Sequence, residues 1–410
     1  MDYSLWLIIG GTSAIAFYMA WSIGANDVAN SMATAVGAKA ITFKQAVLIA
    51  GVLNLIGAVF VGSHVTDTVR KGIVDVTGIE PYILLLGFVS SLLAAAIWVT
   101  VSTWKEMPIS TTHSIIGALI GFGLIAGGTS SIIWEKVGAV AASWIISPIS
   151  GCILAFIVFK IIVKLIFSKE RPVTSAKIVG PVIIGFTAFL IVSSIFLKTS
   201  LSERLGISDI ESLLIASFVS IIIGIIGILL LRKIDDTKVE DYTTVEGIFR
   251  KLQIITSSYV AFAHGANDVA NAIGPVASII PLAQGLDIGG TVEVPVALLV
   301  LGGFGISVGC MTWGRRVMRT VGDRITSLTN TRGFSVDFGA ATTVLIASKL
   351  GLPISTSHTV VGAVIGVGLA RGLEAVDTTV IKKIIVSWLL TLPVAACTSV
   401  VIFICLRFIF

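Results

Sequence analysis

The sequence predicts an all-α, polytopic membrane protein with two inverted-topology repeats, broken helices and re-entrant helical hairpins. The 410-residue chain is 55% apolar and only 12% charged, and its mean hydropathy is +1.02. Apolar runs long enough to cross a bilayer core of about 30 Å recur from end to end. The heptapeptide GANDVAN also occurs twice, at residues 24–30 and 265–271, each time inside such a run. A duplicated polar motif within hydrocarbon-length helices is typical of a transporter.

Hydropathy divides the chain into about 12 membrane segments. They lie near 4–36, 45–63, 82–104, 108–126, 137–166, 178–198, 211–231, 252–281, 294–311, 336–351, 353–371 and 380–410. The first segment lacks the basic region and cleavage site of a signal peptide, so we interpret it as a span. We expect a first repeat at 1–166, two connecting spans and a cytoplasmic linker at 167–251, and a second repeat at 252–410. The linker itself is the polar stretch 232–251.

Basic loops set the expected orientation in the cell membrane. Lysine and arginine cluster near 37–44, 167–177, 232–251, 312–335 and 372–383. Placing these loops in the cytoplasm satisfies the positive-inside rule and leaves both termini outside. An odd number of crossings then separates the two GANDVAN copies, which makes the repeats inverted. The net charge of +5 is explained by these loops and requires no nucleic-acid partner.

Each GANDVAN copy places one carboxylate and two amides where hydrocarbon is expected. The carboxylates are Asp27 and Asp268, and the amides are Asn26, Asn30, Asn267 and Asn271. Ionisable groups at membrane depth usually mark an ion or substrate pathway. Gly24 and Gly265 would permit local unwinding that frees backbone carbonyls, and such hard oxygen ligands suit Na⁺. The alternative is that these residues only let two helices pack closely and hydrogen-bond.

A second motif follows each copy, PISTTH at 108–113 and PISTSH at 353–358. Proline blocks a helix on its N-terminal side and Ser or Thr favours the cap, so a helix should begin there within the membrane. The free N–H groups and hydroxyls at such a start form an anion site. Two of them facing each other could hold a tetrahedral oxyanion; the expected donors are Ser110, Thr111, Thr112, Ser355, Thr356 and Ser357. The alternative is a pair of proline-kinked packing helices.

Three histidines lie beside these motifs. His113 and His358 occupy equivalent positions after the two caps, and they could be donors to backbone, donors to substrate or proton carriers. His264 directly precedes the second GANDVAN. Its counterpart in the first repeat is Ile23, so we do not expect His264 to be a symmetric ligand.

Both GANDVAN copies, both PIST motifs and the stretch GISVGCMTWGRRVMRTVG at 305–322 resemble the inorganic phosphate transporter (PiT) family of cation-coupled phosphate symporters. The resemblance implies inverted repeats, a homodimer, cation ligands at Asp27 and Asp268 with their asparagines, and phosphate at the PIST hydroxyls. It also implies an accessory role for Asp337, where animal members have a glutamate. At the place that we match to it in the first repeat, this chain has Asn54 instead of a second glutamate.

The function expected from these features is uptake of inorganic phosphate driven by Na⁺ through alternating access. The expected partners are phosphate, Na⁺, the lipid bilayer and a second copy of the chain, with no cofactor beyond Na⁺ as the coupling ion. The alternatives are H⁺ coupling or sulfate transport by the same fold, or a passive anion channel. An enzyme is disfavoured, because no GxGD sequence surrounds either aspartate and no GxSxG surrounds the PIST serines.

Overall fold

The computed structural model describes residues 3–62, 73–198, 205–234, 241–283, 294–349 and 354–409, and nearly all of them are helical. The α-helices in chain order are α1 (Tyr3–Gly37), α2 (Phe43–Val61), α4 (Pro81–Trp104), α5 (Thr111–Gly127), α6 (Trp134–Ile162), α7 (Pro172–Lys198), α9 (Asp209–Arg232), α10 (Tyr242–Ala283), α11 (Val296–Trp313), α12 (Arg315–Arg319), α13 (Asn330–Lys349), α14 (Thr356–Leu369) and α15 (Thr378–Ile409). Short helical segments are η1 (Thr129–Ser131), η2 (Val163–Phe167), η3 (Thr320–Arg324) and η4 (Leu373–Ala375). The all-α prediction is confirmed.

Eight helices within the described ranges are long and apolar enough to span a membrane. They include most of α1, all of α2 and α4, and the later helices α6, α7, α9, α11 and α15, while α5 and α14 are shorter apolar helices. These helices support the prediction of a protein with many membrane spans. The sequence-based number of about 12 segments stays a prediction.

The two helical hairpins, α4–α5 and α13–α14, have the helix starts that the PIST motifs predict. Ser110 is the N-cap of α5, and its side chain accepts a hydrogen bond from the backbone N–H of His113 at 3.2 Å. Ser355 caps α14 in the same way, accepting from the backbone N–H of His358 at 3.3 Å. Both expected caps are therefore confirmed.

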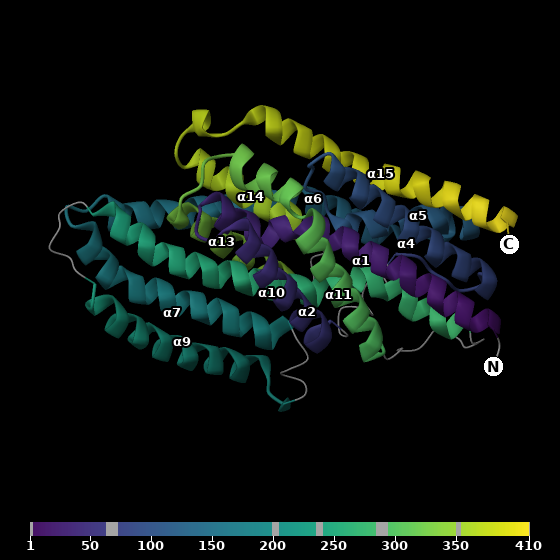
Figure 1. Cartoon of the computed structure of the whole chain (residues 1–410), viewed down its shortest axis with the longest axis horizontal. Coiled ribbons are helices and arrows are strands. Elements are labelled where there is room, and N and C mark those ends of the chain that lie inside the picture. Colours follow the sequence, from purple (N-terminus) through teal and green to yellow (C-terminus); the bar gives the residue numbers. More distant parts are fainter. Residues whose placement is uncertain are drawn as a thin grey trace.

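Each main contact between a helix of the first half and a helix of the second half has a counterpart in which the two halves exchange roles. Helix α1 packs against α11, and α10 packs against α2. Likewise α5 packs against α15, and α14 packs against α6. These helices form one interleaved body, whereas α7 and α9 pair at its side (Figure 1). These contacts indicate which helix of one half corresponds to which helix of the other: α2 corresponds to α11, and α4 corresponds to α13.

The expectation that α1 and α10 unwind at Gly24 and Gly265 is wrong, because both helices are continuous through these residues. A Cβ at Gly24 would overlap the backbone of Ile306 on α11, and one at Gly265 would overlap the backbone of Asn54 on α2. The glycines therefore permit close helix crossings instead of unusual backbone angles. In the first hairpin, the helix break lies at the turn between α4 and α5.

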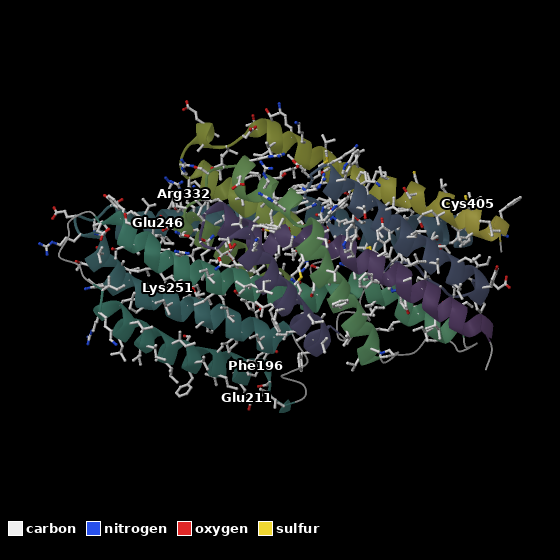
Figure 2. All side chains as sticks on the ribbon, in the orientation of Figure 1. Phe196, Glu211, Glu246, Lys251, Arg332 and Cys405 are labelled. Atoms are coloured by element: carbon white, nitrogen blue, oxygen red, sulfur yellow. The ribbon has the colours of Figure 1, made fainter. Side chains whose placement is uncertain are left out.

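Helix α10 begins at Tyr242, so the second part of the stretch expected to be a linker, 242–251, is helical. Residues 235–240 lie outside the described residues. Glu246, in the first turns of α10, accepts hydrogen bonds at 2.9 Å from the Thr329 hydroxyl and from the backbone N–H of Thr331 at the start of α13. Figure 2 places Glu246 and Arg332 at the opposite end of the molecule from Cys405. The charged start of α10 thus lies at one end of the helical body.

Candidate functional site

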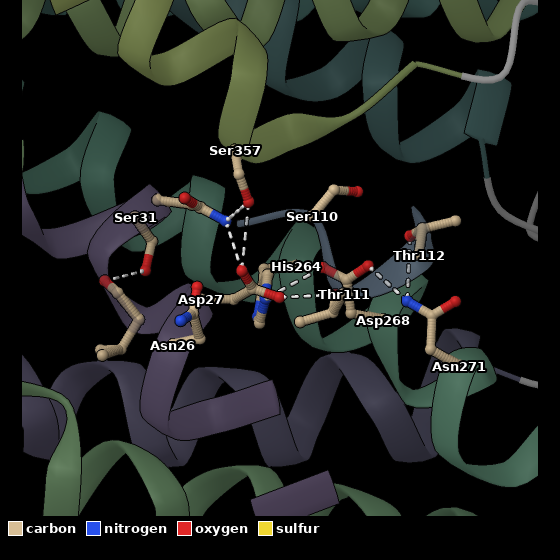
Figure 3. A network of polar contacts seen from close by, with 12 residues as sticks. Asn26, Asp27, Ser31, Ser110, Thr111, Thr112, His264, Asp268, Asn271 and Ser357 are labelled. Atoms are coloured by element: carbon tan, nitrogen blue, oxygen red, sulfur yellow. Dashed lines mark hydrogen bonds and ion pairs between the residues drawn. The ribbon is translucent and has the colours of Figure 1, made fainter. Parts of the chain in front are cut away.

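The two GANDVAN segments meet inside the protein, where α1 and α10 approach the starts of α5 and α14 (Figure 3). The side chains of Asp27 and Asp268 are both buried there, with exposed fractions of 1% and 6% for the two residues. An ionised carboxylate in such a place requires hydrogen-bond donors or a cation. The surrounding side chains show how far that requirement is met.

Asp27 accepts hydrogen bonds from the starts of both hairpins. Thr111, at the beginning of α5, donates to Oδ2 at 2.7 Å. Ser357, at the beginning of α14, donates to Oδ1 at 3.2 Å, and Asn30 donates to the same oxygen at 3.0 Å. One carboxylate from the first repeat therefore touches the expected anion-binding hydroxyls of both repeats.

The last asparagine of each GANDVAN copy reaches across to the hairpin of the other repeat. Asn30 donates to the Ser357 hydroxyl at 2.8 Å, and Asn271 donates to the Thr112 hydroxyl at 3.0 Å. Asn271 also donates to Oδ1 of Asp268 at 3.3 Å. These exchanged bonds give the site an approximate two-fold arrangement around the carboxylates.

The first asparagine of each copy lies apart from its carboxylate. Asn26 holds the turn of the α4–α5 hairpin, because it donates to the Thr103 hydroxyl at 2.9 Å and to the Met107 carbonyl at 3.1 Å. It also accepts from the backbone N–H of Ile109 at 3.2 Å. The corresponding turn of the other hairpin, at 350–353, lies outside the described residues. Asn267 instead lines a cavity of about 40 Å³.

That cavity lies beside the site, between α10, α13 and α14. Besides Asn267, its lining includes Asn30, His264 and Thr356. Thr356 is the expected anion donor that occupies the place of Thr111 in the second hairpin. A cavity of this size with several polar groups on its wall has room for about one water molecule.

The sequence predicts no symmetric ligand role for His264, because Ile23 is its counterpart in the first repeat. The structure places His264 between the two carboxylates. Its Nε2 atom lies 2.9 Å from Oδ2 of Asp268 and 3.6 Å from Oδ2 of Asp27. Its Nδ1 atom lies 2.6 Å from Oδ1 of Asn54. The one available sequence signal was a polar residue on a buried helix next to the motif, and nothing in the sequence pointed to Asn54 as its partner.

The proposed match between Asn54 and Asp337 is wrong, because Asn54 lies on α2 and Asp337 lies on α13. Asp337 is buried and accepts from the hydroxyls of Thr34 at 2.7 Å, Ser257 at 2.5 Å and Thr256 at 3.3 Å. It therefore ties α13 to α1 and α10. The contacts recorded for Asp337 in the described residues do not include Asp27 or Asp268. Its accessory role stays a prediction.

His113 and His358 pack against each other where the two hairpins meet. Their ring centroids are 5.1 Å apart with the rings edge to face. His358 also stacks on Trp388 at 3.9 Å, and the Trp388 indole donates to the Pro108 carbonyl at 3.1 Å. The Nδ1 atoms of both histidines are buried without a hydrogen bond in the described part of the chain. These contacts join the repeats through packing, and those of the described residues include none between either histidine and Asp27 or Asp268.

Buried carboxylates, amides and hydroxyls that converge from two repeated halves of a many-span helical protein define a membrane transporter. The chain belongs to the phosphate transporter family, whose sequence profile matches residues 23–399. It is therefore a multi-pass phosphate transporter and not an enzyme, as the sequence predicted.

Individual relatives cover nearly the whole chain. It is 50% identical to a Pyrococcus abyssi protein named as a candidate phosphate permease, over 98% of each chain. It is 42% identical to the chloroplastic inorganic phosphate transporter 2-1 of Arabidopsis thaliana, over 96% of this chain and 71% of the relative. A solved structure titled as the sodium-dependent phosphate transporter has 46% identity and a TM-score of 0.89, with 98% of this chain and 100% of that chain covered.

Proposed function

We propose that this phosphate transporter is a symporter that imports inorganic phosphate together with Na⁺ by alternating access across the cell membrane. The observation that carries the proposal is the contact of the Asp27 carboxylate with hydroxyls at the starts of both hairpins, Thr111 and Ser357. A group that binds a cation is thus joined directly to the groups expected to bind the anion. The similarity to a sodium-dependent transporter at 46% identity supports Na⁺ as the coupling ion.

The proposed cation ligands are the side chains of Asp27 and Asp268 with their neighbouring asparagines. Carboxylate and amide oxygens are hard ligands, which suit a hard cation. Asn30 and Asn271 each contact both a carboxylate and a hairpin hydroxyl, so they can orient an ion at either aspartate. Asn26 and Asn267 are included among the proposed ligands because they are part of the repeated motif. Asn26 lies at the hairpin turn, and Asn267 lines the cavity.

Binding of phosphate and Na⁺ is coupled through the hydroxyl protons. A hydroxyl donates one hydrogen bond at a time, and those of Thr111 and Ser357 donate to Asp27. A cation on Asp27 takes over the neutralisation of the carboxylate and frees both hydroxyls to donate to phosphate. It also reduces the repulsion between carboxylate and anion. Phosphate therefore binds well only after the cation.

Transport requires the site to open alternately to each side of the membrane. We propose that the two halves are inverted repeats, 1–166 and 252–410, and that the portion with the hairpins rocks about the site. The start of α1 and the end of α15 lie at the same end of the molecule (Figure 1), which supports two termini on the same side, and the basic loops favour the outer side. A homodimer, implied by the family resemblance, is also part of this proposal.

The test is uptake of labelled phosphate into proteoliposomes at fixed pH, with an inward Na⁺ gradient compared with choline of equal concentration. Accumulation above equilibrium with Na⁺ alone supports the proposal. Accumulation only under a proton gradient would show that the coupling ion is H⁺ instead of Na⁺. Flux without any cation gradient would identify a passive channel. Unlabelled sulfate is added as a competitor, and inhibition equal to that by phosphate would contradict selectivity for phosphate.

A further inference from the structure

His264 presents a ring nitrogen to both carboxylates of the site, and the proposed sodium symport assigns it no role. It is buried, with an exposed fraction of 3%. Its Nε2 atom and one oxygen each of Asp27 and Asp268 lie within 4.8 Å of one another. Figure 3 shows the imidazole between the two acidic side chains. The three groups come from two helices and converge on one small volume.

The hydrogen bonds of Asn54 determine which ring nitrogen carries the proton. The Asn54 amide nitrogen donates to the Ala50 carbonyl at 2.7 Å, and that carbonyl can only accept. The amide oxygen of Asn54 therefore faces Nδ1 of His264 at 2.6 Å and must accept from it. With the proton on Nδ1, a neutral His264 has its lone pair on Nε2, directed at the carboxylates.

Around a neutral His264, three acceptor atoms point at one another. An ionised carboxylate oxygen cannot donate a hydrogen bond to Nε2. Nε2 of His264 and Oδ2 of Asp268 are buried 2.9 Å from each other, and neither has another hydrogen-bond partner in the described part of the chain. Converging buried lone pairs are costly, and the cost is removed either by a second proton on Nε2, which lies 2.9 Å from Asp268, or by a metal ion in its place. A divalent ion would balance the two carboxylate charges.

The identity of the donor atoms narrows the choice of ion. Imidazole nitrogen is a ligand for Zn²⁺ and other first-row transition metals, whereas Na⁺, Mg²⁺ and Ca²⁺ prefer oxygen alone. Histidines that bind such metals usually donate their second ring N–H to a neighbouring acceptor, which fixes the orientation of the ring. Asn54 accepts that N–H here. One nitrogen and two carboxylates form a three-ligand site that leaves a position open for water or a substrate oxygen.

We propose that Asp27, His264 and Asp268 form a binding site for one divalent transition-metal ion. The first repeat has no equivalent, because Ile23 stands in place of His264 and Ile306 in place of Asn54. The described residues therefore contain one such site instead of two. The site shares its carboxylates with the proposed Na⁺ sites, so a bound transition metal competes with Na⁺ and inhibits sodium-driven uptake.

The test is titration of the purified, chelator-treated protein with Co²⁺ in choline buffer that contains neither Na⁺ nor phosphate. The visible absorption of Co²⁺ and the heat of binding report the ligand set and the stoichiometry. We expect one Co²⁺ per chain, displaced by Zn²⁺. The paired variant Asn54→Ile with His264→Ile installs the apolar pair of the first repeat, and we expect its affinity to fall at least about tenfold.

A control separates this site from the other buried histidines. His113→Gln removes an imidazole that faces His358 and no carboxylate, so we expect unchanged Co²⁺ affinity. If the paired isoleucine variant does not fold, His264→Gln replaces it, and loss of the nitrogen ligand then shows in the absorption spectrum. Absence of Co²⁺ binding in the native protein, or equal affinity in the native protein and the His264 variants, overturns the proposal.

Failure of this inference is distinguishable from failure of sodium symport. Na⁺-driven uptake is measured separately in chelator-treated vesicles, where no transition metal is present. Sodium-driven uptake without Co²⁺ binding would leave symport intact and remove the metal site. Co²⁺ binding without any Na⁺ dependence of uptake would leave the metal site and contradict sodium coupling.

Discussion

The two GANDVAN copies have the same seven residues but different chemical surroundings. In both, the glycine allows a close crossing with a neighbouring helix, and the last asparagine bonds to the hairpin of the other repeat. The carboxylates differ, because Asp27 accepts from three donors, while Asp268 accepts from Asn271 and lies closer to His264 than Asp27 does. The motif thus fixes the backbone geometry, and residues outside it decide the chemistry of each copy.

The crossing beside each copy shows where the asymmetry begins. At the crossing of α1 and α11 the motif glycine meets Ile306, and at the crossing of α10 and α2 it meets Asn54. In the first half Ile306 and Ile23, the residue before the motif glycine, are both buried and apolar, whereas in the second half Asn54 bonds to His264. An apolar pair and a polar pair therefore occupy equivalent places. Replacement of Asn54 or His264 alone by an apolar residue would leave the other one buried without this hydrogen-bond partner.

The largest expected effect comes from neutralising either carboxylate. In Asp27→Asn and Asp268→Asn, Na⁺-driven phosphate uptake should fall by about tenfold to a hundredfold, because an amide supplies no charge to bind the cation. Asp27→Asn should also lower the thermal midpoint more than Asp268→Asn, since Asp27 accepts three hydrogen bonds. Proteoliposome uptake and thermal unfolding in detergent measure the two effects.

Asp75→Asn serves as the control for this comparison. Asp75 is an exposed carboxylate outside the helices, and it accepts from the backbone N–H of Thr77. Hydrogen bonding to Thr77 lowers the pKa of Asp75, so this residue is a charged surface group without a link to the site. Its uptake should match that of the native protein. Unchanged uptake in both site variants, at equal insertion, would contradict the assigned cation ligands.

The second prediction concerns the glycines that the two copies share. Gly24→Ala and Gly265→Ala place a Cβ against the backbone of Ile306 and of Asn54, respectively. Because backbone cannot move aside as a flexible side chain can, each variant should lose about 1–3 kcal/mol of stability. The thermal midpoint, followed by size-exclusion chromatography after heating, gives the measurement. Equal losses in the two variants would show that the crossings are equivalent.

Each glycine has a matched control on its own helix. Gly10 on α1 and Gly247 on α10 have no atom within 4 Å of an added Cβ. Alanine at these positions should leave stability unchanged or raise it by up to about 1 kcal/mol, because alanine favours the helix over glycine. If Gly24→Ala and Gly10→Ala behaved alike, the close crossing would not limit the stability of the fold.

The third prediction tests the polar pair directly. Asn54→Ile and His264→Ile each leave a buried group without its partner, which should cost about 1–3 kcal/mol. The double variant removes both polar groups and should cost clearly less than the sum, with a coupling of about 0.5–3 kcal/mol. Thermal unfolding of the four proteins completes the cycle. Additive losses would show that the bond between Asn54 and His264 contributes nothing to the fold.

Much of the fold could be predicted from the sequence because its signals are local. Apolar runs predict spans, and a proline followed by serine predicts the start of α5 and of α14. The unwinding at Gly24 was wrongly predicted, because glycine serves equally for unusual backbone angles and for close helix approach. Only the position of α11 shows that approach is the reason here.

The composition of the site could be predicted only where the repeat itself marks it. The aspartates, asparagines and hydroxyls recur in both halves, and the structure brings Asp27, Thr111 and Ser357 together. His264 was missed because a search by symmetry discounts a residue without a counterpart. Its bond to Asn54 joins residues 210 positions apart, and no local pattern reports such a distance.

The smallest expected effects come from the bonds that each copy makes to the opposite hairpin. Thr112→Val removes the acceptor of Asn271, and Ser357→Ala removes the acceptor of Asn30 together with a donor to Asp27. A single bond contributes about 0.5–1.5 kcal/mol, so Thr112→Val should raise the KM for phosphate by about two- to tenfold. Ser357→Ala loses two bonds and should raise it more. Uptake at varied phosphate and saturating Na⁺ measures both constants.

Ser114→Ala distinguishes loss of a site contact from loss of any buried hydroxyl on a hairpin. Ser114 lies one turn beyond the cap of α5 and donates only to the Ser110 carbonyl of its own helix start among the recorded contacts. Its KM should stay at the native value, because no group of the site loses a partner. A KM for Ser357→Ala no higher than that for Thr112→Val would show that the hydroxyl contact to Asp27 contributes nothing to phosphate binding, and the two copies would then be equivalent at this step.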